Sequence, residues 1–137
     1  MTSRVLYRIA AALIVLFDLG HTAGAPWSEP EWGVDLSAVR SSHFMVLGFS
    51  RTYWDFYVGF GLIVSVLLLL TAVIAWELGN LPAESLRRVR LTIWALPLCF
   101  AAMTVLNCVH FFTIPIAFSG AITACLVAAG WRSAKAA

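Results

Sequence analysis

The sequence is poor in charge. Only 12% of its 137 residues are Asp, Glu, Lys or Arg, whereas 61% are hydrophobic. A soluble domain carries about 25% charged residues, and a soluble chain of this length could not bury so much apolar surface. Lipid must therefore be the solvent for much of the chain, which predicts an integral membrane protein.

Several motifs that carry chemistry are also absent. The sequence has no P-loop, no G-x-G-x-x-G, no H-E-x-x-H and no G-x-S-x-G. The net charge of +2 is small, and no basic run is interleaved with aromatic residues, so nucleic-acid binding has no support. Cys99 and Cys108 would lie about 13 Å apart along one helix, too far for a disulfide. The sequence also has no C-x-x-C pair, so its cysteines argue against a thiol oxidoreductase.

Four apolar stretches are long enough to cross a membrane, which takes about 20 residues each. Two of them stand alone, and the tract from Leu91 to Trp131 is long enough for two crossings. We place its break at residues 107–110, because Pro115 then falls in the first turn of the fourth helix. The predicted fold is all-α, a single membrane domain over residues 1–137 forming a four-helix up-down bundle. The helices are expected at about residues 5–25, 52–76, 90–108 and 112–131.

The distribution of positive charge predicts the orientation. Arginine and lysine lie before the first span, between the second and third, and after the fourth, at Arg4, Arg8, Arg87, Arg88, Arg90, Arg132 and Lys135. The connection from residue 26 to residue 51 instead carries three acidic residues against two arginines. The positive-inside rule then places both termini in the cytoplasm.

The N-terminal segment also imitates a secretory signal, with Ala23-Gly24-Ala25 in the place of a cleavage site. Asp18 and His21 lie between the apolar run and that site, and Pro26 follows it directly. We therefore interpret the segment as a true first membrane helix.

The long first loop contains the pattern of a short amphipathic helix over about residues 36–47. Asp35 is a favourable N-cap, and Val34 before it is placed to pack onto Val39. Apolar residues recur at helical spacing up to residue 47, and Gly48 is expected to end the helix. His43 lies on the apolar face, so we expect it to point toward the bundle. The helix is expected to lie at the membrane interface, either as a plug or as a lid.

Two sets of residues bear on helix packing. Gly20 and Gly24 form a small-xxx-small pair, and Gly59 and Gly61 lie one turn into the second span. Small residues let backbones approach closely inside a membrane. On the second span Asp55, Gly59 and Leu62 share one helix face. We therefore expect Asp55 to look toward the tightest helix contact.

Most polar residues of the spans would reach one depth in the membrane. Asp18, His21 and Thr22 lie near the end of the first span at positions i, i+3 and i+4, which is one helix face. The others open the second span or lie at the break between the third and fourth, namely Tyr53, Trp54, Asp55, Asn107 and His110. Ionisable groups inside a membrane are costly, so this layer is the candidate functional site.

The roles predicted for these residues follow from their chemistry. An Asp–His pair can act as general acid and base, and the residues assigned to it are Asp18, His21 and Asp55. The residues assigned to ligand binding are His43, Tyr53, Trp54, Asn107 and His110. Structural alternatives stay open for three of them. Thr52-x-x-Asp55 is a capping box, His21 can lock two helices together, and His110 can face water.

The stretch Ser50–Gly61, together with Leu19-Gly20-His21-Thr22, resembles a family of small uncharacterised bacterial four-helix membrane proteins. In size and topology the chain is also similar to DoxX-like proteins. The resemblance implies a bacterial inner membrane and a four-helix fold. It supplies no reaction and no site residue.

Three classes of function follow. In the first, an outer-leaflet pocket binds a small apolar or lipid-like molecule, with or without acid–base chemistry. In the second, His21, His43 and His110, together with Asp18 or Asp55, hold a metal or a haem. No H-x3-H pair gives ligand spacing, and no metal ligand or cofactor is assigned. In the third, the protein is an assembly subunit without a ligand. The expected partners are membrane lipid and a small hydrophobic ligand, and self-association into a homo-oligomer is left open.

Overall fold

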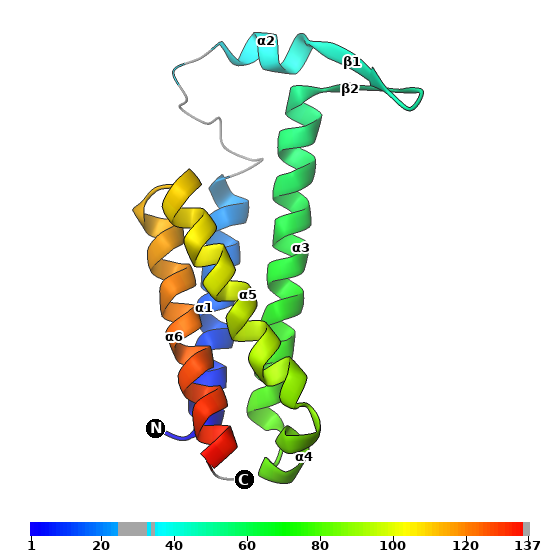
Figure 1. Ribbon diagram of the computed structural model, residues 1–137. Helices are drawn as coiled ribbons and strands as arrows, with labels where there is room; N and C mark the ends of the chain where they lie inside the picture. Colours follow the sequence, from blue (N-terminus) through cyan, green and yellow to red (C-terminus); the bar gives the residue numbers. More distant parts are fainter. Residues whose placement is uncertain (25–32, 34, 136–137) are drawn as a thin grey trace. The chain divides into compact units, whose positions relative to one another are not determined.

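The computed structural model describes residues 1–24, 33 and 35–135 (Figure 1). Its helices are α1 (Ser3–Gly24), α2 (Leu36–Ser41), α3 (Tyr53–Asn80), α4 (Ala83–Arg88), α5 (Arg90–His110) and α6 (Thr113–Lys135). Two short strands, β1 (His43–Val46) and β2 (Phe49–Thr52), form the sheet. The helices α1, α3, α5 and α6 are long and apolar enough to cross a membrane. The predicted all-α bundle is confirmed, and the chain is a multi-pass membrane protein.

The ends of the spans differ from those predicted. The helix α3 continues to Asn80, and α5 continues through the expected break at residues 107–110 to end at His110. The turn between α5 and α6 is Phe111-Phe112 instead. The polar residues did not mark the turn because Asn107 lies inside the last turns of α5, where its carbonyl accepts from the Phe111 amide at 3.0 Å.

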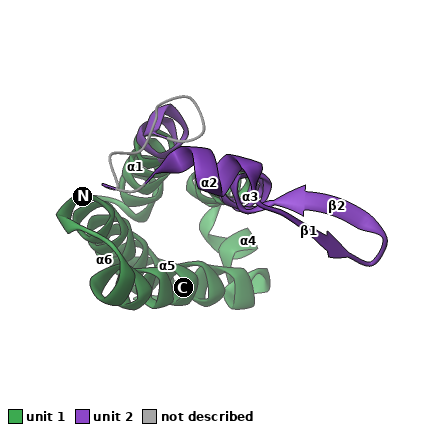
Figure 2. Ribbon diagram, turned by 90° about the horizontal axis from the view of Figure 1, so that it is seen from above, with its two compact units in different colours: residues 1–17, 68–137 green, residues 18–67 purple. Residues whose placement is uncertain are grey.

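The chain divides into two compact units (Figure 2). Unit 1 comprises residues 1–17 and 68–137, and unit 2 comprises residues 18–67. Helices α1 and α3 each contribute to both units.

Unit 1 holds the main core. Its largest fully buried side chains are Tyr7 of α1, Phe100 of α5, and Ile122 and Leu126 of α6, with Ile14 of α1 beside them. The start of α1, the short helix α4 and the end of α6 lie at the same end of this unit (Figure 1). The core thus joins helices from both ends of the sequence.

Two glycines of unit 1 permit close helix contacts. A Cβ at Gly79 would lie 3.3 Å from both the Arg4 carbonyl oxygen and the Tyr7 Cβ. A Cβ at Gly130 would lie 3.1 Å from the Ile93 Cγ2. Helix α3 therefore approaches α1 closely at Gly79, and α6 approaches α5 at Gly130. Sequence reasoning did not single out either position.

Of the four glycines expected at helix contacts, Gly61 alone has a described neighbour in reach, since a Cβ there would lie 4.0 Å from His21 Nε2. A Cβ added to Gly20, Gly24 or Gly59 would meet no described atom within 4 Å. Leu62, predicted to share the contact face, is 41% exposed. The buried face of α3 instead carries Ser65, Leu68 and Ala72. Because α3 is apolar on all sides, its composition did not indicate which face meets a neighbour.

The interfacial helix predicted for residues 36–47 was only half right. Helix α2 begins as expected, because the Asp35 side chain accepts from the Ser37 amide at 2.9 Å. Hydrogen bonds from the Ser37 hydroxyl and amide hold the pKa of the Asp35 carboxyl below its ordinary value. The helix ends at Ser41, and the expected packing of Val34 lies outside the described residues.

The second half of that segment is an antiparallel hairpin. Strands β1 and β2 pair from His43 opposite Thr52 to Val46 opposite Phe49. Leu47 and Gly48 connect them with positive φ angles of 48° and 85°. Two residues with positive φ form the tight turn that matches the twist of a hairpin. Gly48 therefore serves the hairpin turn rather than the end of a helix.

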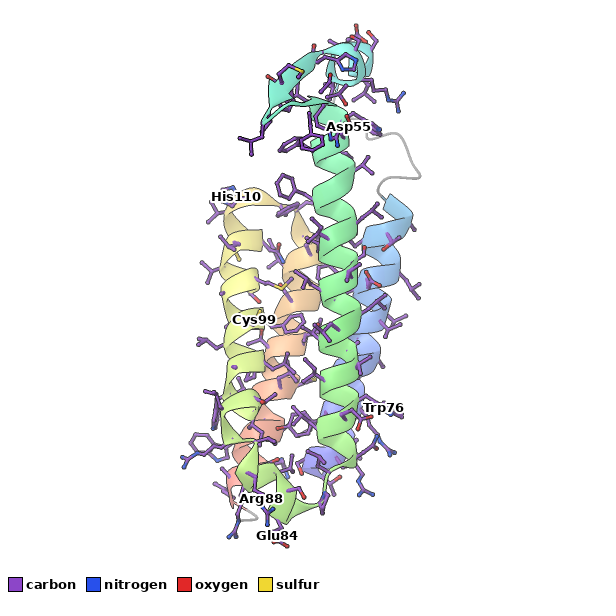
Figure 3. The ribbon with its side chains drawn as sticks, turned by 90° about the vertical axis from the view of Figure 1, so that its right-hand side faces the viewer. Asp55, Trp76, Glu84, Arg88, Cys99 and His110 are labelled. Carbon is purple, nitrogen blue, oxygen red and sulfur yellow. The ribbon has the colours of Figure 1, made fainter. Side chains whose placement is uncertain are left out.

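Helix α4 was not predicted. It occupies the connection between α3 and α5, and its Arg88 pairs with Glu84 at 3.6 Å (Figure 3). Both side chains are more than 80% exposed, so the pair contributes little to stability.

Candidate functional site

A polar cluster joins α1 and α3 inside unit 2. It consists of Asp18, His21 and Thr22 from α1 and Gly61 and Ser65 from α3. The positions i, i+3 and i+4 put the first three on one face of α1, as predicted. The ring nitrogen Nε2 of His21 lies 3.1 Å from the Gly61 carbonyl oxygen, and the Thr22 and Ser65 hydroxyls lie 2.7 Å apart.

The direction of each hydrogen bond follows from the acceptors. A carbonyl oxygen only accepts, so His21 Nε2 carries the proton in this hydrogen bond. In a neutral imidazole with its proton on Nε2, Nδ1 is an acceptor, and it has no partner within the described residues. The Thr22 hydroxyl donates to Asp18 Oδ1 at 3.4 Å, so the Ser65 hydroxyl donates to Thr22. The hydrogen bonds therefore form a chain in which Ser65 donates to Thr22 and Thr22 donates to Asp18.

The cluster has acceptor capacity to spare. Asp18 is only 5% exposed, and the long bond from Thr22 is the one hydrogen bond that its side chain has within the described residues. An ionised carboxylate offers about four lone-pair sites. Together with Nδ1 of His21, this leaves acceptors without donors in a membrane-spanning segment, where each is costly.

The close contact at His21 depends on Gly61. A Cβ at this position would lie 4.0 Å from His21 Nε2, so the ring is in contact with the backbone of α3. Sequence reasoning missed Ser65, and it named Gly61 only as a small residue for helix packing, not as the partner of His21. The only available signal was a serine four residues after a glycine in an otherwise apolar run.

Asp55 lies in a capping box at the start of α3. Its Oδ2 accepts from the Thr52 amide at 2.8 Å, and its own amide donates to the Thr52 hydroxyl at 3.0 Å. The side chain is exposed (Figure 3), and the residue lies six positions before Gly61, about 9 Å along the helix. Asp55 therefore serves the helix start and is not part of the polar cluster.

Replacing Thr52 by alanine is expected to lower the free energy of unfolding by about 1 kcal/mol, because the Asp55 amide loses its acceptor. Hydrogen exchange of the first amides of α3 should become faster, since this end would fray. Replacing Thr71 by alanine is the control, because that hydroxyl only bonds the Leu68 carbonyl within the same helix. Unchanged exchange at the start of α3 in the Thr52 variant would show that the box does not stabilise the helix.

His43 does not take the place expected for it. It lies on β1, is exposed, and its Nδ1 lies 3.2 Å from the Ser50 hydroxyl of β2. The prediction that it points with an apolar helix face was wrong, because the segment around it is a strand. The structure therefore shows no lid formed by an interfacial helix at His43.

The aromatic residues at the start of α3 contact the hairpin and α2. Phe44 of β1 packs against Tyr53 and Phe56, with ring centroids 5.0 and 5.3 Å apart. The Arg40 guanidinium lies 4.5 Å from the centroid of the Trp54 ring, which is a cation–π contact. Tyr53 and Trp54 were both predicted to bind ligand. In the structure Tyr53 packs against β1 and Trp54 contacts α2, so they hold these two elements against the start of α3.

Asn107 and His110 lie on the last turns of α5 in unit 1. Asn107 is buried, and its amide donates to the Pro115 carbonyl at 3.2 Å and to the Ser119 hydroxyl at 3.1 Å. His110 is exposed at the end of the helix (Figure 3). Asn107 therefore joins α5 to α6, while His110 faces the surroundings.

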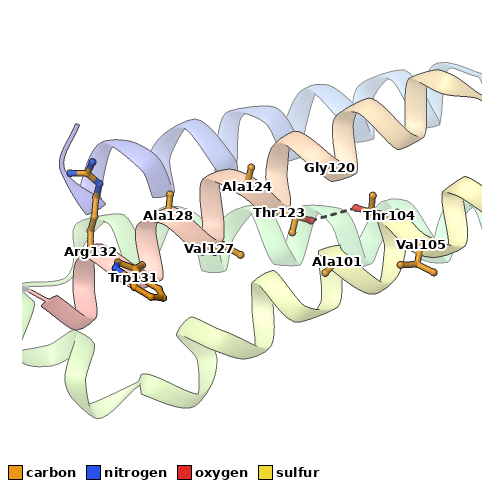
Figure 4. A pocket seen from close by; sticks show the side chains of 10 residues that line it. All are labelled: Ala101, Thr104, Val105, Gly120, Thr123, Ala124, Val127, Ala128, Trp131 and Arg132. Atoms are coloured by element: carbon orange, nitrogen blue, oxygen red, sulfur yellow. Dashed lines mark hydrogen bonds between the residues drawn. The ribbon is translucent and has the colours of Figure 1, made fainter.

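A groove between α5 and α6 was not predicted. It has a volume of about 690 Å³ (Figure 4) and is lined by Ala101, Thr104, Val105, Gly120, Thr123, Ala124, Val127, Ala128, Trp131 and Arg132. The hydroxyls of Thr104 and Thr123 lie 3.4 Å apart within it. The sequence did carry a signal, since Gly120, Ala124 and Ala128 are small residues at intervals of four.

Within the described residues, no group of three His, Cys, Asp or Glu side chains is placed to hold a metal ion. No protein-family model matches the chain, and searches of curated proteins and of solved structures find no match. Function therefore has to be argued from the chain itself.

Proposed function

We propose that this is a small protein of a bacterial inner membrane with both termini in the cytoplasm. The support is the charge bias, because arginines gather where α1 begins, around α4 and where α6 ends, all at one end of unit 1. A cysteine introduced at Ser3 should react with a membrane-impermeant reagent only from the cytoplasmic side. Labelling from the outer side would contradict the orientation.

We further propose that the protein binds a small, mostly apolar molecule at the Asp18–His21 cluster. The observation that carries this proposal is the spare acceptor capacity of a nearly buried carboxylate and a half-buried imidazole in a membrane span. Since both free groups are acceptors, the polar head of the ligand must donate hydrogen bonds, as a hydroxyl or an amine does.

The surroundings fit a ligand whose remainder is apolar. Phe60 and Val64, next to Gly61 and Ser65 in the sequence of α3, are exposed apolar side chains. Ligand sites in proteins commonly combine such a lining with a few convergent polar groups. The proposal does not include catalysis, because Asp18 and His21 bond to Thr22 and Gly61 rather than to each other.

The experiment that tests binding is an extraction. The protein is purified in lipid nanodiscs formed directly from membranes, and its bound molecules are compared by mass spectrometry with the bulk membrane extract. We expect enrichment of one apolar hydroxyl- or amine-bearing molecule, at about one per chain. An extract with the composition of the bulk membrane would contradict the proposal.

A second candidate function is that of an assembly subunit without a ligand. The observation that favours it is that the His21–Gly61 and Thr22–Ser65 hydrogen bonds both join α1 to α3. Interhelical bonds of this kind hold membrane helices together, at about 0.6 kcal/mol each. An extract without an enriched molecule would favour this function.

A further inference from the structure

A second cavity lies wholly within unit 1. It has a volume of about 280 Å³ and lies between α4, α5 and α6. Its lining consists of Leu86, Arg87, Arg90, Ile93, Trp94, Gly130, Ser133 and Ala134. It is thus a small cavity whose lining includes two arginines, both of which are exposed.

Neither of these arginines has an acidic partner. Within the described residues, Arg87 and Arg90 make no ion pair and no side-chain hydrogen bond. The neighbouring Arg88 differs, because it pairs with Glu84 and does not line the cavity. A guanidinium group presents a planar set of donors that matches the oxygens of a phosphate group.

The packing around the cavity fixes its shape. Leu86 is 5% exposed and anchors α4 in the core of unit 1. Gly130 brings α6 against Ile93 of α5, where a Cβ would lie only 3.1 Å from the Ile93 Cγ2. The short helix α4 therefore carries Arg87 at a defined position rather than on a loose loop.

The cavity and the α5–α6 groove follow one another along the same two helices. The groove is lined by residues 101–105 of α5 and 120–132 of α6, and the cavity by residues 93–94 and 130–134. Trp131 and Arg132 lie at the end of the groove nearest the cavity (Figure 4). Tryptophan and arginine are typical of the level of lipid headgroups.

We propose that this end of unit 1 is a binding site for an anionic phospholipid. Arg87 and Arg90 bind the phosphate in the cavity, and an acyl chain lies along the groove between α5 and α6. Basic pockets between membrane helices on the cytoplasmic side are known to take such headgroups. The apolar groove of about 690 Å³ argues for a lipid rather than a free phosphate ion, because only a lipid has an acyl chain to cover it.

The test is a titration of the delipidated full-length protein with phosphatidylglycerol, followed by native mass spectrometry. Arg87→Gln combined with Arg90→Gln should lower the affinity at least tenfold, and phosphatidylcholine with the same chains should bind weakly to every variant. Arg87→Gln alone should lower the affinity several-fold. Arg88→Gln is its matched control, since it removes one charge from the same helix α4 without touching the cavity, and it should change the affinity less than twofold. Equal losses in both variants would show a general attraction to surface charge and would overturn the site.

Two further arms distinguish the source of the phosphate and the role of the groove. Inorganic phosphate should not displace phosphatidylglycerol, and displacement would show a site for a free anion instead. Ala124→Leu fills the groove from an exposed position, so it should weaken binding of long-chain phosphatidylglycerol several-fold and leave the short-chain form unaffected. Equal effects on both forms would overturn the placement of the acyl chain. Unchanged thermal unfolding without lipid shows that each variant is folded.

Discussion

Replacing Tyr7 by alanine is expected to lower the free energy of unfolding by about 2–3 kcal/mol, whereas replacing it by phenylalanine is expected to change it by less than about 0.5 kcal/mol. Tyr7 is fully buried in unit 1, where α3 contacts it at Gly79. In a membrane, the unfolded side chain stays in lipid, so the cost is mainly that of the cavity. A void of roughly 100 Å³ at about 24 cal/mol per Å³ gives this magnitude.

The phenylalanine variant tests a different property of the same residue. The Tyr7 hydroxyl is buried without a hydrogen-bond partner within the described residues. Ser133 lies near it, but the Ser133 hydroxyl donates to the Ala129 carbonyl at 2.9 Å and does not meet hydrogen-bond geometry with Tyr7. Removing an unsatisfied hydroxyl should cost little or nothing. Unfolding in bicelles by steric trapping measures both variants. A loss in Tyr7→Phe as large as in Tyr7→Ala would show that the hydroxyl, not the ring, stabilises the core.

Replacing His21 by phenylalanine is expected to weaken ligand binding at least tenfold, which is about 1.4 kcal/mol. The ring keeps its approximate size, but both the free Nδ1 acceptor and the bond to the Gly61 carbonyl are lost. The free energy of unfolding should fall by only about 0.6 kcal/mol, the typical contribution of one interhelical hydrogen bond in a membrane.

Ser65→Ala is the matched control for this variant. It removes the other hydrogen bond between α1 and α3, to Thr22, and leaves Asp18 and His21 in place. We expect a similar loss of stability and a change in ligand retention of less than about twofold, which is about 0.4 kcal/mol. Both quantities can be measured on protein purified in nanodiscs. If both variants lost stability as expected but no ligand were retained even by the original chain, the cluster would be a structural lock.

The membrane spans could be predicted because a bilayer imposes a strict requirement of length and apolarity. The ends of the helices could not, because apolar character does not mark where a helix stops. Asn107 shows this directly, since its polar side chain serves a contact with α6 rather than a turn. The hairpin was missed for another reason. Leu47 adopts a positive φ that is uncommon for leucine, so the usual sequence signal of such a turn was absent.

Half of the candidate site was also predictable. The spacing of Asp18, His21 and Thr22 placed them on one helix face, and that arrangement depends on one helix alone. Their partners depend on how α3 is rotated about its axis. One of those partners is the Gly61 carbonyl, a backbone group that the sequence cannot single out. The other is Ser65, whose apolar neighbours in the sequence did not indicate which face of α3 meets α1. Asp55 was assigned to the site because it was expected at the same depth in the membrane. In the structure it forms a capping box with Thr52 instead.

The most direct test of the central claim is nuclear magnetic resonance of the His21 ring nitrogens in protein labelled at histidine. His21→Gln identifies the signals, since the chain has three histidines. We expect a proton on Nε2, donated to the Gly61 carbonyl, and an unprotonated Nδ1 whose resonance shifts when the bound ligand is stripped away and returns when it is restored. An Nδ1 resonance that is the same before and after stripping would contradict binding at this cluster.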